Sequence, residues 1–264
     1  METISPCRVN PCEANTVRKL SHAPGGQEIF MEAYLGEFLG TMILVFLGDC
    51  VVANVVLHKT KGNGSGWSVI VLGWMVAVMV PVMMFGAISG AHFNPAVTLG
   101  LAVGSDFSWA KVPGYISCQM AGGVVGGILV FIFYRPHFNV TENKDAKLAV
   151  FATAPAIRST VDNLISEFMA TFLLVFAIFG AIVYASDVPG PIAIAGIILA
   201  MGTALGGTTG YAMNPARDFA PRVAYWLCPI KDKRDPDWGY SWVPVVGPLL
   251  GGLAAGLAAM AVFM

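Results

Sequence analysis

The sequence contains two identical triplets, Asn-Pro-Ala at 94–96 and at 214–216. Asparagine is a good helix N-cap and proline is favoured at the first helical position, so each triplet alone is typical of a helix start. The side-chain amides of Asn94 and Asn214 offer N–H donors, and a helix N-terminus adds positive potential. Such a pair could hydrogen-bond a passing neutral molecule while opposing cations and protons.

Three ionisable residues lie at matching or unusual places. Arg217 directly follows the second triplet, and Glu37 and Glu167 each lie near the start of a long apolar segment. An arginine at membrane depth is costly and marks a pathway by default; the alternative is a snorkelling arginine paired with neighbouring Asp218. Buried carboxylates usually either satisfy hydrogen bonds or relay protons. The matched positions of the two glutamates favour a structural role over proton transport.

The composition excludes an ordinary soluble domain. Of the 264 residues, 56% are hydrophobic and 12% charged, whereas a soluble domain is about 25% charged. The net charge of −1 offers no basic stripe for nucleic acid, and five cysteines, an odd number, do not suggest a disulfide framework. These features predict a small polytopic membrane protein.

The distribution of charge predicts six membrane spans, because each needs about 20 mostly apolar residues. We place them at roughly 33–57, 67–87, 110–133, 162–184, 190–208 and 241–263. The uncharged runs 62–105 and 188–216 are longer than one span requires. Each run must therefore hold a span plus a further segment at membrane depth.

The two halves of the chain resemble each other, which sets the expected topology. GEFLGTMILVFLG at 36–48 is similar to SEFMATFLLVFAIFG at 166–180, and SGAHFNPAVT at 89–98 is similar to TGYAMNPARD at 209–218. Three spans in each repeat return the chain to the opposite side, so the second repeat must be inverted.

The segments 95–104 and 215–228 have room for half-membrane helices that meet N-terminus to N-terminus. Non-helical backbone at this depth must be buried or line a watery cavity. The preceding loops would then offer carbonyl acceptors, namely those of Gly90, Ala91, His92, Gly210, Tyr211, Ala212 and Met213.

These motifs resemble those of the major intrinsic protein family, the aquaporins and glycerol facilitators. GEFLGT, SGAHFNPAVT and TGYAMNPARDFAPR carry the resemblance, which covers about 33–264. It implies an all-α membrane protein with the aquaporin fold: six transmembrane helices and two re-entrant half-helices in two inverted three-helix repeats. We expect a disordered N-terminal tail at 1–30 and one channel domain at 31–264, with repeat one at about 33–133 and repeat two at about 162–264.

The resemblance also implies which residues form the pore. Beside the motif residues Asn94, Pro95, Ala96, Asn214, Pro215 and Ala216, it places a selectivity filter at Trp74, Gly202, Tyr211 and Arg217. Water-selective relatives typically have histidine at the fifth-span position, where Gly202 leaves space. Glu37, Glu167 and Asp218 are expected to support the loops, and His92 to steady its own loop. Asp49 has no assigned role, although it could lie near the outer mouth.

The residues at these positions best fit a bacterial member of the glycerol facilitator, or aquaglyceroporin, branch of the family. We expect a passive channel for glycerol and other small uncharged solutes, with some water, that excludes ions and protons. The alternatives are a channel mainly for water or for another neutral solute such as protonated lactic acid, and an ion-coupled transporter with discontinuous helices. An enzyme is the least supported class, because the spans show no nucleophile–base constellation or metal-ligand cluster.

The remaining expectations concern partners and surroundings. We predict no cofactor, metal or catalytic residue, since Cys7, Cys12 and His22 make only a weak metal-ligand pattern. The resemblance implies a homotetramer in the plasma membrane with both termini inside. Lysine and arginine are scarce in the segments that would lie inside, so the positive-inside rule alone would not choose this orientation.

Overall fold

The structure is a computed structural model that describes the backbone of residues 26–185 and 187–264, and side chains from residue 31 onward with the same gap. Most of the predicted tail, including Cys7, Cys12 and His22, lies outside the described residues. The first described helix begins at Gly26, so helical structure starts before the tail boundary that we placed at residue 30.

Six long helices match the six predicted spans: α2 (Gly26–Val56), α3 (Trp67–Ser89), α5 (Val112–Val140), α7 (Thr160–Tyr184), α8 (Gly190–Thr209) and α10 (Val243–Phe263). All six are long and apolar enough to cross a membrane, and the described residues contain no strand. The predicted all-α fold is therefore confirmed. The largest differences are at the start of α2, which precedes the predicted start at 33, and at the end of α5, which continues past the predicted end at 133 because Arg135 ends the apolar run without ending the helix.

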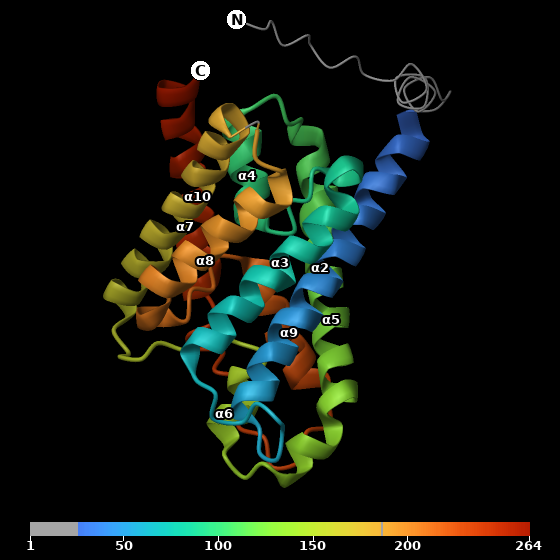
Figure 1. Ribbon diagram of the computed structural model, residues 1–264, viewed down its shortest axis with the longest axis vertical. Coiled ribbons are helices and arrows are strands. Elements are labelled where there is room, and N and C mark those ends of the chain that lie inside the picture. The colour runs from blue at the N-terminus through green and yellow to red at the C-terminus, as the bar shows by residue number, and fades with distance from the viewer. Residues whose placement is uncertain (1–25, 186) are drawn as a thin grey trace, which may run out of the picture.

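Two short helices, α4 (Pro95–Gly104) and α9 (Pro215–Leu227), occupy the predicted half-helix segments. They lie in opposite halves of the molecule: α4 in the half that holds the end of α10, and α9 in the half that holds α6 (Lys144–Ala149) (Figure 1). A short 3-10 helix, η1 (Trp109–Lys111), precedes α5. The pairing follows the repeat, because α4 packs against α10 while α9 packs against α5.

Glycines let the half-helices approach the long helices closely. A Cβ atom on Gly252 of α10 would lie 2.3 Å from the carbonyl oxygen of Ala96, and one on Gly123 of α5 would lie 2.4 Å from that of Ala216. A side chain at either position would push the half-helix away. Small residues at helix contacts are the usual means of close packing in membranes.

Candidate functional site

The two motif asparagines bring the half-helices together at their N-termini. The Oδ1 of Asn94 accepts from the Ala96 N–H at 2.8 Å, and that of Asn214 accepts from the Ala216 N–H at 2.9 Å. Each Nδ2 then donates across the junction. Asn94 donates to the Met213 carbonyl at 2.8 Å, and Asn214 donates to the Phe93 carbonyl at 2.8 Å.

This network fixes both amides and determines what they can offer. An asparagine amide has two N–H donors, and each of these amides uses one of them on the opposite loop. The oxygen is held by the first turn of its own helix, so the amide cannot rotate to become an acceptor. One N–H of each asparagine remains, so a solute at the junction must accept a hydrogen bond.

Glu37 holds the first loop from inside the helix bundle. Its Oε1 accepts from Ser89 Oγ at 2.7 Å and from the His92 N–H at 3.0 Å. Its Oε2 accepts from the Phe93 N–H at 2.8 Å and from Gln119 Nε2 at 2.7 Å. Both carboxylate oxygens are therefore engaged with groups that shape the loop or its surroundings.

Glu167 holds the second loop at the matching positions of the repeat. Its Oε1 accepts from Thr209 Oγ1 at 2.6 Å and from the Ala212 N–H at 3.0 Å, and its Oε2 accepts from the Met213 N–H at 2.8 Å. Glu37 and Glu167 are fully buried. A buried carboxylate that accepts several hydrogen bonds has little left to exchange, which argues against a proton relay.

The loops before the half-helices run in an unusual backbone conformation. Ala91 and Phe93 have positive φ angles of 53° and 49°, and the matching Tyr211 and Met213 have 42° and 47°. Within the described part of the chain, no protein donor bonds to most of the carbonyls that we predicted to line the pore, those of Gly90, Ala91, His92, Gly210, Tyr211 and Ala212.

Two loop carbonyls accept from the asparagine of the opposite half-helix. The Met213 carbonyl, which we predicted to face the solute, accepts from Asn94, and the Phe93 carbonyl has the same role toward Asn214. Phe93 was not among the predicted residues. The His92 side chain bonds Thr98 Oγ1 through Nδ1 at 3.1 Å and packs its ring against Tyr115, which ties the loop to α4 and α5.

Trp74, Tyr211 and Arg217 come together beside the asparagines. They line one small cavity of about 50 Å³ with Asn94 and Asn214. The guanidinium carbon of Arg217 lies 3.9 Å from the centroid of the Trp74 ring, within cation–π range. The indole N–H of Trp74 and the hydroxyl of Tyr211 are buried with no hydrogen-bond partner among the described residues.

Gly202, the fourth predicted filter residue, acts in a different way from the one we expected. A Cβ atom there would lie 2.8 Å from Val71 and 3.0 Å from the Tyr211 ring. The space that the glycine leaves is therefore taken by the tyrosine and not by the pore. Gly202 shapes the filter indirectly, by letting Tyr211 lie close to α8.

Sequence reasoning missed two residues that seat the filter aromatics. A Cβ atom on Gly48 of α2 would lie 2.4 Å from the Trp74 ring, so this glycine makes room for the indole. Trp67 donates from Nε1 to the Gly202 carbonyl at 3.3 Å and meets the Tyr211 ring edge-on at 5.7 Å between centroids. Nothing in the spacing of the motifs links either residue to its partner.

Asp218 is committed to partners other than Arg217. Its Oδ1 accepts from Nη2 of Arg222 at 2.8 Å, and its Oδ2 accepts from the Thr153 N–H at 2.7 Å and hydroxyl at 2.6 Å. Asp218 and Arg222 therefore form an i, i+4 ion pair on α9. The carboxylate near Arg217 is instead Asp49, whose Oδ1 lies 3.9 Å from Nη1. Pairing with Asp218 does not explain the buried position of Arg217.

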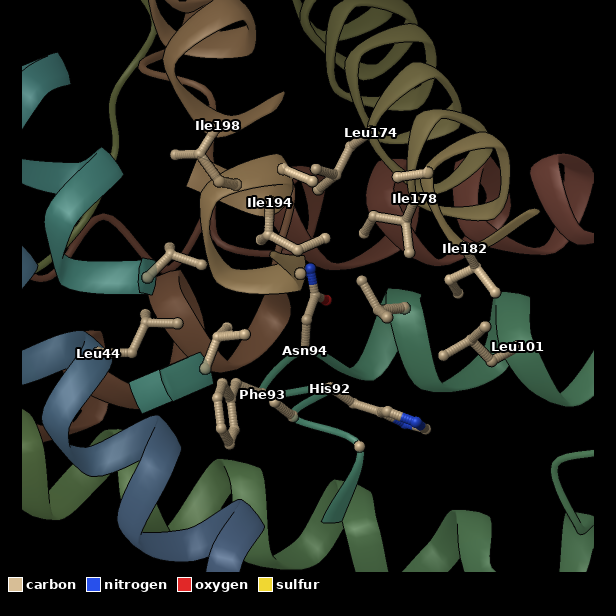
Figure 2. Close-up of a pocket in the computed structure, with 18 of the residues that line it drawn as sticks. Leu44, His92, Phe93, Asn94, Leu101, Leu174, Ile178, Ile182, Ile194 and Ile198 are labelled. Atoms are coloured by element: carbon tan, nitrogen blue, oxygen red, sulfur yellow. The ribbon is translucent and has the colours of Figure 1, made fainter. Parts of the chain in front are cut away.

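A second cavity, of about 260 Å³, lies on the other side of Asn94. Figure 2 shows the Asn94 amide standing among apolar side chains, while the Phe93 ring turns away from it. Its apolar walls come from α2, α3, α4, α7 and α8 and include Leu101, Ile178, Ile182 and Ile194. Asn94 and Asn214 line both cavities, so the asparagines mark the junction between the larger apolar chamber and the small cavity that Arg217 lines.

Comparisons with known proteins agree over nearly the whole described chain. A family model described as Major intrinsic protein matches residues 27–259. The chain is 53% identical over 224 residues to a protein of Thermotoga maritima named "Probable glycerol uptake facilitator protein", covering 84% of this chain and 96% of that relative. It is 50% identical over 226 residues to the glycerol uptake facilitator protein of Streptococcus pneumoniae, covering 85% and 97%.

A solved structure is similar as well. The aquaglyceroporin from Plasmodium falciparum has a TM-score of 0.77 and 31% sequence identity, covering 89% of this chain and 97% of that one. The match in sequence and in fold thus extends over almost the full length of the proteins compared.

Proposed function

The chain belongs to the major intrinsic protein family, and we propose that it is a passive channel for glycerol and other small uncharged solutes in the plasma membrane. Relatives at 50–53% identity are named for glycerol uptake, and they match over nearly their full length. The observation that carries the assignment is the small cavity at which Trp74, Tyr211 and Arg217 meet the two asparagines.

The groups around this cavity suit the two sides of a polyol. Arg217 and the free N–H of each asparagine can donate to hydroxyl oxygens, while the open loop carbonyls can accept from hydroxyl hydrogens. The Tyr211 ring and the side chains of Leu44 and Leu174 give the carbon side an apolar wall. A polyol that leaves water loses hydrogen bonds, and these partners replace them along its path.

Ions would meet the opposite situation. The asparagines present only donors toward the junction, and both half-helices point their N-termini at it. The resulting positive potential opposes cations and protons. An anion would have to leave water and pass the apolar chamber on one side of the junction, where few donors replace its hydration.

Water passage and assembly belong to the same proposal. Water is smaller than glycerol and can both donate and accept, so we expect the channel to conduct some of it. We infer a homotetramer from family membership. Large apolar side chains are exposed on the long helices, where lipid or neighbouring copies would cover them: Leu72, Met83, Ile132, Met169 and Leu173.

The proposal is tested by stopped-flow measurement of glycerol entry into liposomes that contain the purified protein. We expect glycerol entry well above that of protein-free liposomes, and unchanged entry in Met169→Ala, which alters an exposed residue away from both cavities. Entry at the lipid background rate would contradict the proposal.

The same liposomes separate the alternative functions. Water or lactic acid flux far above glycerol flux would favour a different main solute. Glycerol flux that depends on an imposed pH or sodium gradient would indicate an ion-coupled transporter, whereas a passive channel follows the glycerol gradient alone.

A further inference from the structure

Asp49 on α2 is a fully buried carboxylate that the proposed path does not use. Neither of its oxygens has a hydrogen-bond partner among the described residues. Burying an unpaired carboxylate costs several kcal/mol, so such a group is retained only beside a compensating charge. Among the described residues, the cation within ion-pair distance is Arg217, 3.9 Å away from Oδ1 to Nη1.

The other charges near this position are already paired with each other. Arg222 and Asp218 form their own ion pair at 2.8 Å, and Asp218 also accepts from Thr153. Arg217 donates no side-chain hydrogen bond to a described residue, and its guanidinium lies between Asp49 and the Trp74 ring, 3.9 Å from the ring centroid. Among the described residues, Asp49 and Arg217 are therefore each left with the other as an ion-pair partner.

The internal repeat provides an independent observation. The half-helix motifs are offset by 120 residues from Asn94 to Asn214, and the opening glutamates by 130 residues from Glu37 to Glu167. By these offsets, the counterpart of Arg217 is Val97 and the counterpart of Asp49 is Phe179.

The two counterparts lie in one apolar cluster. One repeat therefore has charges at both positions, and the other has charge at neither. This pattern is expected when the carboxylate at position 49 compensates the charge of the arginine at position 217.

We propose that Asp49 is the counter-charge of Arg217, which positions the guanidinium at the filter and thereby determines its specificity for neutral solutes. The proposal rests on the proposed function, because the filter is assigned through it. An arginine without a partner would give the filter a net charge and draw anions. A neutral pair keeps the guanidinium donors for hydroxyl groups while its charge is cancelled nearby.

The test is a double-mutant cycle on glycerol flux in liposomes, with Asp49→Asn, Arg217→Val and the variant with both changes. If Asp49 acts through Arg217, Asn at 49 should reduce glycerol flux about tenfold in the native background, the scale of coupling between charged neighbours. It should change flux less than about twofold when position 217 is already Val.

Equal reductions in both backgrounds, or none in either, would overturn the proposal. The matched control is Cys50→Ser, the next residue on α2, which is not fully buried. It should leave the flux as in the native protein.

A second readout tests the ion pair without any transport. Arg217→Val strands the buried carboxylate, so this variant should unfold at a lower temperature than the double variant, in which both charges are gone. A double variant that unfolds at the same or a lower temperature would contradict the pairing. Because this measurement needs no glycerol, it distinguishes failure of the ion pair from failure of the proposed function.

Discussion

The two ends of the pore are built from matching positions of the repeat and from opposite kinds of side chain. The polar end has the three cavity-lining filter residues and the glycine behind them, whereas the counterparts by the 120-residue offset are all apolar or small. The matched pairs, polar end first, are Trp74 and Ile194, Gly202 and Val82, Tyr211 and Ala91, and Arg217 and Val97. All four counterparts line the larger cavity, of about 260 Å³ against about 50 Å³.

This difference separates the frame of the pore from its selectivity. Each repeat supplies a buried glutamate, a loop with left-handed residues, and a capping asparagine that donates to the opposite loop. The frame is therefore duplicated. Discrimination among solutes has to come from the few positions where the repeats diverge, which we propose are the filter positions.

The largest effect should come from making the polar end resemble the apolar one at Arg217. In Arg217→Val, the filter has valine as at position 97, loses its positive charge, and leaves the Asp49 carboxylate without its counter-charge. We expect cation leak through liposomes to rise about a hundredfold, because a charge at membrane depth counts for about 3 kcal/mol. Conductance that stays at the native level would locate cation exclusion at the asparagines. Val97→Ala is the matched control and should cause no leak.

The duplicated frame can be tested by exchanging each glutamate for its amide. Glu167→Gln turns one acceptor toward the loop into a donor that faces other donors, which should lower the free energy of unfolding by about 2 kcal/mol. Glu37→Gln should cost less, by about 1 kcal/mol, because the Gln119 amide can flip and accept with its free oxygen, although it then loses its bond to Thr98. Thermal unfolding in detergent checks both, and equal losses would show that Gln119 does not compensate.

A smaller effect is expected at Gly202, because Tyr211 and not the pore occupies the space beside this glycine. In Gly202→Ala, the new methyl group would press on Val71 and the Tyr211 ring. We expect the ring to shift toward the pore and glycerol flux to fall about threefold, since overpacking of this size is modestly costly. Val82→Ala, at the matching position, should leave the flux nearly unchanged. A larger flux in Gly202→Ala would mean that Tyr211 moves away from the solute.

The frame of the molecule could be predicted from the sequence because it follows local rules. Uncharged runs set the spans, and Asn94 and Asn214 set the starts of the half-helices through their capping chemistry. The end of α5 could not be placed in this way. The predicted span ended with the apolar run near Arg135, but backbone hydrogen bonding continues beyond a charge.

The contacts at the candidate site depend on residues that are far apart in the chain, so spacing alone could not reveal them. Tyr211 fills the space left by Gly202, and Trp74 lies in the space left by Gly48. Asp49 was visible as an unexplained charge, but its pairing with Arg217 required the fold. The repeat did hold one signal for it, since Asp49 aligns with the apolar Phe179 by the 130-residue offset.

The location of selectivity is tested best by the permeability ratio of glycerol to a five-carbon polyol in Trp74→Ala and Ile194→Ala. These variants trim matching positions at the two ends of the pore. We expect Trp74→Ala to lower the permeability ratio about tenfold, which corresponds to a loss of about 1.4 kcal/mol of discrimination. Ile194→Ala should leave the ratio at the native value. Equal changes in the two variants, or a change confined to Ile194→Ala, would contradict the claim that selectivity resides at the polar end.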